Sequence, residues 1–281
     1  MQYINEFLRF PGGKAKCLTL SYDDGVQQDA QLCQLMQRYG IAGTFNINSG
    51  SYSPEDKIFP AGEAHRRMTK AAATALYRSS PLFEVATHGY THPSLECLSG
   101  VHVIHQIYAD REAIEQDYDC ICRGHAYPFG TYNAQVMDCL KNCGIVYART
   151  VQSTEKFALP EDFLQWHPTC HHNNPRLMEL ANNFLAEPCL RKPRLFYLWG
   201  HTYEFEEDDN WQVIETFFQK VGGREDVWYA TNIQIYDYVQ AFRQLQWSVD
   251  GNRIYNPTVT DVWVKLGKDT CCIKGGETLT L

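Results

Sequence analysis

Two patterns of apolar and polar residues alternate between residues 17 and 245. Short apolar runs, typical of buried strands, precede longer stretches in which apolar residues recur every three or four positions, as on one face of a helix. The runs that predict strands cover residues 17–22, 44–48, 83–87, 125–127, 145–149, 195–199 and 227–230. The stretches that predict helices are 32–39, an Ala-rich segment beginning at Thr69, 104–117, 133–142, 175–187, 211–221 and 233–245. This alternation predicts a parallel sheet with helical crossovers.

The number of strands favours a closed α/β architecture. About seven or eight strands alternating with helices are typical of a (β/α) barrel, here an irregular one, rather than of an open doubly wound sheet. The chain also lacks the sequences G-x-G-x-x-G and G-x-x-x-x-G-K-[ST] that accompany nucleotide binding in open sheets. From Trp247 onward, short alternating segments are separated by Gly and Asn. We therefore expect a barrel domain over residues 1–246 and a small β-rich appendage over 247–281, packed on the barrel.

Composition excludes several classes of protein. The chain has 281 residues, and its 33 Asp and Glu exceed its 25 Lys and Arg, which gives a net charge of −8 and argues against a nucleic-acid partner. No apolar run approaches the ~20 residues of a membrane span, and the sequence MQYINEFLRF lacks the apolar core of a signal peptide. We expect a cytoplasmic protein with no membrane partner. Its eleven cysteines form no C-x-x-C pair, so we expect reduced thiols.

Polar clusters follow the predicted strands, at the end of a barrel where active sites lie. These clusters are SYDDG at 21–25, THGYTH at 87–92, YPFG at 127–130, Arg149, and GHTYE at 200–204. Five clusters at one end of one scaffold predict a catalytic site more strongly than any single motif does.

Two adjacent aspartates and two histidines suggest a metal site. Side chains alternate in direction along a strand, so one of Asp23 and Asp24 can bind a cation while the other stays free as a base. A turn with helix capping is the alternative explanation of the DDG triplet. His88 and His92 can reach one point if the turn between them is tight. Two imidazoles and one carboxylate are typical ligands of a divalent metal ion, and we expect Zn²⁺, with Co²⁺, Ni²⁺ or Mn²⁺ as alternatives.

The ordered set SYDDG, HGYTH, YPFG and LWGH resembles the polysaccharide deacetylase family, the carbohydrate esterases with a NodB-homology domain. The resemblance covers residues 21–201 and implies an irregular (β/α)₇ barrel that removes N- or O-acetyl groups from sugars with the help of a metal. It implies Asp24, His88 and His92 as the metal ligands. It further implies Asp23 as the general base, His201 as the general acid and the backbone N–H of Phe129 as a donor to the oxyanion.

The sequence departs from the family pattern at two motifs. The third motif usually reads R-x-P-x-G, but Ala126 occupies the position of the Arg, and the usual D-x-W of the fourth motif is not evident after Gly144. We predict that Arg149, at the end of the next strand, reaches Asp23, orients it and supplies the missing positive charge. An ion pair between Arg149 and a loop acid such as Glu155 is the alternative.

Several further residues could line a substrate pocket. Tyr127 lies beside the predicted oxyanion donor, and Trp166 lies in a long irregular segment, 150–174, with His167, His171 and His172. Trp166 can stack on a sugar or fill the core. Glu204, in the acidic run that continues to Asp209, is expected to be solvated. His65 carries no clear signal.

Three functions fit these observations. The first is a metal-dependent deacetylase of an acetylated sugar or short oligosaccharide. The second is a hydrolase of a small amide such as a cyclic imide or ureide, and the third is a carbohydrate-binding barrel without catalysis. The free carboxylate expected at Asp23 argues against the third function, because binding alone has no use for it.

Overall fold

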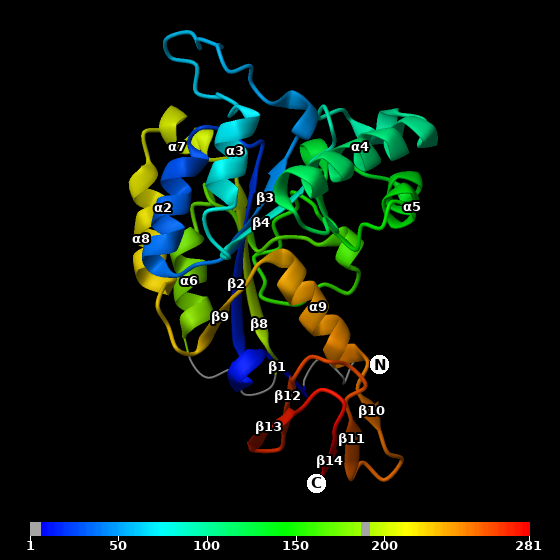
Figure 1. Cartoon of the computed structure of the whole chain (residues 1–281). Coiled ribbons are helices and arrows are strands. Elements are labelled where there is room, and N and C mark those ends of the chain that lie inside the picture. The colour runs from blue at the N-terminus through cyan, green and yellow to red at the C-terminus, as the bar shows by residue number, and fades with distance from the viewer. Residues whose placement is uncertain (1–6, 187–191) are drawn as a thin grey trace.

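The computed structural model describes residues 7–186 and 192–281, and a parallel sheet of eight strands forms its centre (Figure 1). The strands are β2 (Lys16–Asp23), β3 (Gly43–Ile47), β4 (Phe83–Thr87), β5 (Gly124–Ala126), β6 (Tyr147–Arg149), β7 (Cys170–His171), β8 (Arg194–Gly200) and β9 (Val227–Tyr229). Their order is β6-β5-β4-β3-β2-β8-β7, and β9 pairs with the first residues of β2. Every pairing in this sheet is parallel.

The sheet curls, and an irregular segment joins its two ends. Trp166 forms an isolated parallel bridge with Arg149 on β6. Only a few residues later, Cys170 pairs with Leu198 on β8. The segment between Trp166 and Cys170 therefore connects β6 to β8 in place of one long regular strand. This arrangement is the predicted irregular (β/α)₇ barrel.

Within the described residues, eight α-helices surround the sheet. They are α2 (Asp29–Tyr39), α3 (Lys70–Tyr77), α4 (Gly100–Tyr118), α5 (Ala134–Asn142), α6 (Leu177–Leu185), α7 (Tyr203–Glu207), α8 (Trp211–Val221) and α9 (Asn232–Arg243). Figure 1 shows α2, α6 and α8 together on one side and α4 and α5 on the other. Some helix ends follow from local chemistry: Thr69 and Asn133 cap α3 and α5, and Gly40, at φ 64°, ends α2.

Apolar side chains fix the helices to the sheet. The largest cluster joins β2, β3 and β8 to the helices α2, α6 and α8, with fully buried residues such as Leu18, Leu32, Phe196 and Phe217. A smaller cluster holds α4 and α5 against the other side of the sheet. The barrel is thus packed by the same apolar positions whose spacing predicted its elements.

Two small antiparallel sheets lie at the end of the barrel where β2 begins (Figure 1). One contains β10 (Gln246–Trp247), β11 (Arg253–Tyr255) and β14 (Thr278–Thr280). The other contains β12 (Val262–Leu266), β13 (Asp269–Ile273) and β1 (Leu8–Arg9), which comes from the opposite end of the chain. The pairing of β1 was not expected from the sequence. It connects the first described residues to the C-terminal appendage, beneath the barrel.

No helix within residues 7–186 and 192–281 is long and apolar enough to cross a membrane. The ten cysteines of these two ranges are free thiols, and six of them are buried.

Candidate active site

The carboxyl ends of the strands bring the predicted site residues together. Asp23 ends β2, His88 follows β4, and Arg149 ends β6. His201 follows β8. These ends meet because all the strands of the sheet run in the same direction.

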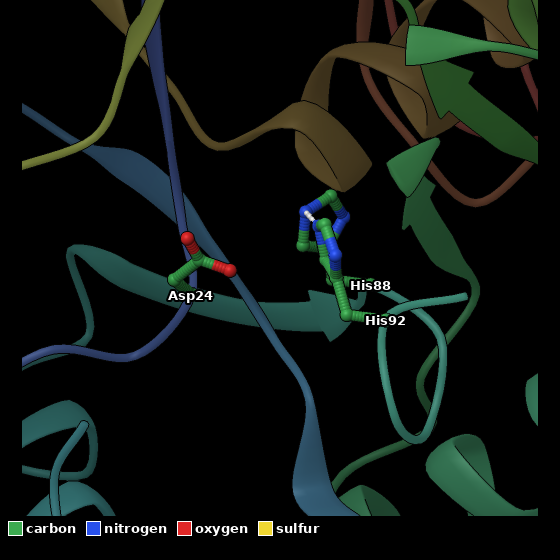
Figure 2. Close-up of side chains that lie close together, drawn as sticks. All are labelled: Asp24, His88 and His92. Carbon is green, nitrogen blue, oxygen red and sulfur yellow. Dashed lines mark hydrogen bonds between the residues drawn. The ribbon is translucent and has the colours of Figure 1, made fainter. Parts of the chain in front are cut away.

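Asp24, His88 and His92 form a cluster whose three ligand atoms lie within 4.8 Å of one another. Figure 2 shows the two imidazoles side by side, with the carboxylate across from them. The two Nε2 atoms are 3.1 Å apart, and His88 Nδ1 lies 2.8 Å from the carbonyl oxygen of Ala126. Because a carbonyl only accepts, the proton of His88 is on Nδ1 and the lone pair of Nε2 faces the cluster.

The charge states of this cluster also suit a cation. Burial lowers the pKa of His88, against the charges of Asp23 and Asp24. Burial, together with His88, lowers the pKa of His92 to about 4. Neutral imidazoles are the form that binds metals, and two nitrogens with one carboxylate oxygen are a donor set that Zn²⁺ accepts. The residues present therefore fit a divalent ion.

Three site residues have left-handed backbones. Asp24, His92 and Phe129 have φ values of 81°, 59° and 59°. Residues other than glycine rarely adopt this region, and each such residue costs on the order of 1–3 kcal/mol that the surrounding structure must offset. Strained positions of this kind concentrate at functional sites, and here two of the three would hold a metal.

Two residues of the loop before α3 contact Asp24, and neither was expected from the sequence. His65 Nε2 is 3.1 Å from Asp24 Oδ2. Arg67 donates to Asp24 Oδ1 at 3.1 Å and to the Asp24 carbonyl at 2.7 Å. Burial alone would raise the pKa of Asp24, but His65, His88 and Arg67 hold it well below its usual range. Asp24 is therefore ionised and ready to bind a cation.

Asp23 lies beside this cluster and is held by two donors. Asn46 donates to Asp23 Oδ1 at 2.8 Å, and the Arg149 guanidinium donates to Oδ2. The ion pair is buried, since the side chains of Arg149 and Asp23 are 0% and 2% exposed. The guanidinium also lies over the Trp199 ring, 4.4 Å from its centroid. Arg149 thus contacts Asp23, as the sequence predicts, while Glu155 pairs with Arg176 instead.

His201 also lies close to Asp23. Its Nε2 atom is 3.8 Å from Asp23 Oδ2, and its side chain is 21% exposed. Glu204, on α7, lies 3.2 Å from His201 Nδ1. The expectation that Glu204 is solvated is therefore wrong: it is mostly buried among His201, His171 and His172. A five-residue helix gives no periodic signal, so its contacts were not visible in the sequence.

Phe129 lies at the rim of the site, whereas its neighbour Tyr127 does not. The Phe129 ring is 61% exposed, and its edge meets the His92 ring at a centroid distance of 4.6 Å. Tyr127 is fully buried and donates to the Leu164 carbonyl at 2.8 Å. The burial of Tyr127 corrects the expectation that its side chain binds a substrate.

Trp166 belongs to the core. It is 1% exposed, and its ring packs edge-on against Tyr147, Phe163 and Tyr197. No ring face is left for a sugar, which corrects the expectation of stacking. The alternative, an aromatic residue that fills the barrel, is the observed arrangement.

Asp110, in the middle of α4, holds the loop that carries the histidines. It accepts from the backbone N–H of His88 at 3.0 Å and from the N–H and hydroxyl of Ser49 at 2.8 and 2.6 Å. Nothing in the local sequence points to this contact. Asn46 lies near the end of β3, where the other site residues also follow strands. Its position at a strand end could therefore have indicated that it belongs to the site.

Comparisons with known proteins point to one family. Residues 11–148 match the family model for polysaccharide deacetylase. No curated protein matches the chain. A candidate polysaccharide deacetylase from Mycobacterium smegmatis is 17% identical, with a TM-score of 0.60 over 84% of this chain and 94% of that one.

Two other solved structures share the fold. The carbohydrate esterase family 4 domain of a xylanase from the hindgut metagenome of Trinervitermes trinervoides is 14% identical, with a TM-score of 0.52 over 80% of this chain and 92% of that one. A family 4 carbohydrate esterase from Streptomyces lividans is 14% identical, with a TM-score of 0.50 over 76% and 91%. At these identities the three structures show a shared fold. The similarity to the polysaccharide deacetylase family rests on residues 11–148, slightly less than half of the chain.

Proposed function

We propose that this protein is a metal-dependent hydrolase that removes an N- or O-linked acetyl group from a sugar or short oligosaccharide. The observation that carries the proposal is a complete set of metal-binding side chains, Asp24, His88 and His92, beside a second carboxylate, Asp23, that has its own partners. A site that only bound a metal would need no such carboxylate. Hydrolysis needs a base in that place.

Asp24, His88 and His92 would hold the metal ion, for which Zn²⁺ is the first candidate and Co²⁺, Ni²⁺ and Mn²⁺ are alternatives. When bound, a divalent ion polarises the acetyl carbonyl and makes water more acidic. The fixed tautomer of His88 and the ionised state of Asp24 prepare both ligands for this charge.

Asp23 takes the proton of the attacking water. Arg149 and Asn46 hold the carboxylate in place, so little reorganisation is needed when it accepts the proton. Phe129, next to His92 at the rim, places a backbone N–H near the acetyl oxygen, where it would donate to the negative charge that develops.

His201 acts as the acid. The bond between the acetyl carbon and the sugar nitrogen or oxygen breaks, and its electron pair goes to the leaving atom. His201 Nε2 gives that atom a proton, and acetate is released. An amine leaves poorly without this proton, so a partly exposed imidazole close to Asp23 suits the step.

Metal exchange and a substrate screen test the proposal. Chelator-treated protein should lose activity and regain it with Zn²⁺ or Co²⁺. His92→Ala should lose both metal and activity, while His105→Ala, an exposed histidine on α4, should change neither. The screen compares N-acetylglucosamine oligomers, acetylated xylose and allantoin-like ureides.

Activity on the ureides alone would replace the deacetylase assignment with that of a ureide hydrolase. Full activity in protein shown by elemental analysis to be free of metal would overturn the metal dependence.

A further inference from the structure

Glu204 holds His201 with both of its carboxylate oxygens. Oε1 lies 3.2 Å from His201 Nδ1, and Oε2 accepts from the His201 backbone N–H at 3.3 Å. The same Oε2 lies 3.1 Å from His171 Nε2 and 3.0 Å from His172 Nε2, although the latter contact lacks hydrogen-bond alignment. One carboxylate thus meets the ring and the backbone of His201 together, and two further imidazoles surround it.

The charge of Glu204 determines the tautomer of His201. Burial favours the neutral carboxyl, but contacts with His171, His172 and His201 hold the pKa of Glu204 well below its usual range. An ionised carboxylate only accepts, so the proton shared with His201 belongs to Nδ1. The other ring nitrogen, Nε2, then lies on the side of Asp23, at 3.8 Å from its Oδ2.

We propose that Glu204 is a positioning residue for the acid: it keeps the Nδ1–H of His201 bound and turns Nε2 toward the leaving group. The catalytic role of Glu204 in this inference rests on the proposed function. Its effect on the orientation of the His201 ring rests on the contacts alone. When Nε2 gives up its proton, Nδ1 keeps its own, so the next proton returns to Nε2. The acid is therefore regenerated in the same orientation after each turnover.

The groups that face His201 define its protonation. Glu204 on α7, Asp23 and Asp24 at the end of β2, and His171 on β7 are the charged or titratable neighbours, and Trp199 and Tyr203 contribute rings. Burial lowers the pKa of His201, but the hydrogen bond to Glu204 and the charge of Asp23 outweigh it, and the pKa is raised. Removal of the Glu204 charge should therefore lower this pKa.

A second metal ion is the competing explanation of this cluster. The ligand atoms of His171, His201 and Glu204 lie within 4.8 Å of one another. Their contacts, at 3.1 and 3.2 Å, are already those of hydrogen-bonded imidazole and carboxylate. A cation bound through Nδ1 of His201 would also need that nitrogen without its proton, which would prevent the arrangement that we propose.

Glu204→Gln in the zinc-loaded protein tests the proposal, with Glu207→Gln on the same helix as the matched control. Glu207 is exposed and carries the same charge. The pKa of His201, measured by NMR titration of its ring nitrogens, should fall by at least about one unit in Glu204→Gln, which is a ~10-fold loss of protonated imidazole on the alkaline side. The control should titrate like the unmodified protein.

The pH–rate profile gives the second result. The alkaline limb of kcat should move to lower pH in Glu204→Gln, with a loss of at least about tenfold on amide substrates there. Activated aryl esters, whose leaving groups need no proton, should lose much less. If Glu204→Gln fails to fold, Glu204→Asp, which keeps the charge at a shorter reach, should preserve the NMR pKa while lowering kcat on amides.

Either of two results would overturn the proposal. The first is an unchanged NMR pKa of His201 in folded Glu204→Gln, or a lowered pKa of His201 in folded Glu204→Asp. The second is a zinc content of two equivalents in the dialysed protein that falls to one in His171→Ala. Failure of the deacetylase assignment is a separate outcome, because the NMR titration needs no substrate: a lowered pKa without deacetylase activity would keep the positioning of His201 and remove only the reaction.

Discussion

At the scale of single residues, two adjacent aspartates have different surroundings. Asp24 turns into a left-handed backbone and meets His65 and Arg67, whereas Asp23 remains in the strand and meets Asn46 and Arg149. The alternation of side chains along β2 predicts this separation, so the sequence was sufficient to predict that Asp23 and Asp24 point in different directions. It was not sufficient to predict the contacts of His65 or Glu204, because those contacts join segments with no local pattern in common.

The different surroundings lead to a prediction for Asp23→Asn. The amide keeps the shape of the carboxylate but cannot take a proton from water, so kcat should fall by ~10²–10⁴-fold. Zinc content should stay at one equivalent, because Asp23 is not in the metal cluster. Elemental analysis and steady-state kinetics on the same preparation measure both quantities. A variant with nearly full turnover would exclude Asp23 as the base.

At the scale of elements, regular pieces were predictable and short ones were not. Helices such as α3 and α5 carry their own N-capping side chains, and β2 and β8 are buried along nearly their whole length. By contrast, β7 has two residues and α7 has five, too few for any period to show. Their positions depend on tertiary contacts, which include a buried carboxylate at the start of α2.

That carboxylate, Asp29, gives a prediction about pH. It accepts hydrogen bonds from Tyr77 on α3 and from Thr202 beside α7, and burial raises its pKa to about 7 despite them. A group with a raised pKa in the folded state favours folding when protonated, so its contribution is lost as pH rises from about 4 through about 7. The free energy of unfolding should therefore decline over this range.

Asp29→Asn should remove part of this decline, on the order of 2 kcal/mol between pH 5 and pH 8. Urea unfolding at both pH values measures it. Asp110, whose pKa burial also raises to about 7, should leave a residual decline in the variant. Identical pH dependence in the two proteins would show that Asp29 is not responsible.

At the scale of the whole molecule, the two ends of the chain close the bottom of the barrel. Leu8 on β1 pairs with Val264 on β12, and both belong to a buried cluster with Phe242 of α9 and Ile273 of β13. The small sheets therefore share a core with the barrel. We propose that residue 246 divides the chain in its sequence pattern only. We expect residues 1–246 and 247–281 to unfold together.

Ile273→Ala tests this coupling. Ile273 is 1% exposed, so the loss of its side chain should cost about 2–5 kcal/mol of unfolding free energy and lower the midpoint of one single transition. Val259→Ala, at a fully exposed position of the same segment, should change the stability by less than about 0.5 kcal/mol. Two separate transitions in thermal unfolding of the unmodified protein would contradict a shared core.

The pairing of β5 with β6 means that either strand could carry the positive charge beside Asp23. Ala126 and Arg149 are partners in the parallel register, so their side chains emerge on the same face about 4.8 Å apart. An Arg at position 126 or at position 149 could pair with Asp23. Activity should therefore depend on where the positive charge lies in space and not on which of the two strands carries the Arg. Arg149→Ala should impair turnover, Ala126→Arg alone should crowd two guanidinium groups, and the double variant should recover activity lost by Arg149→Ala. A double variant no better than Arg149→Ala would show that the two positions are not interchangeable.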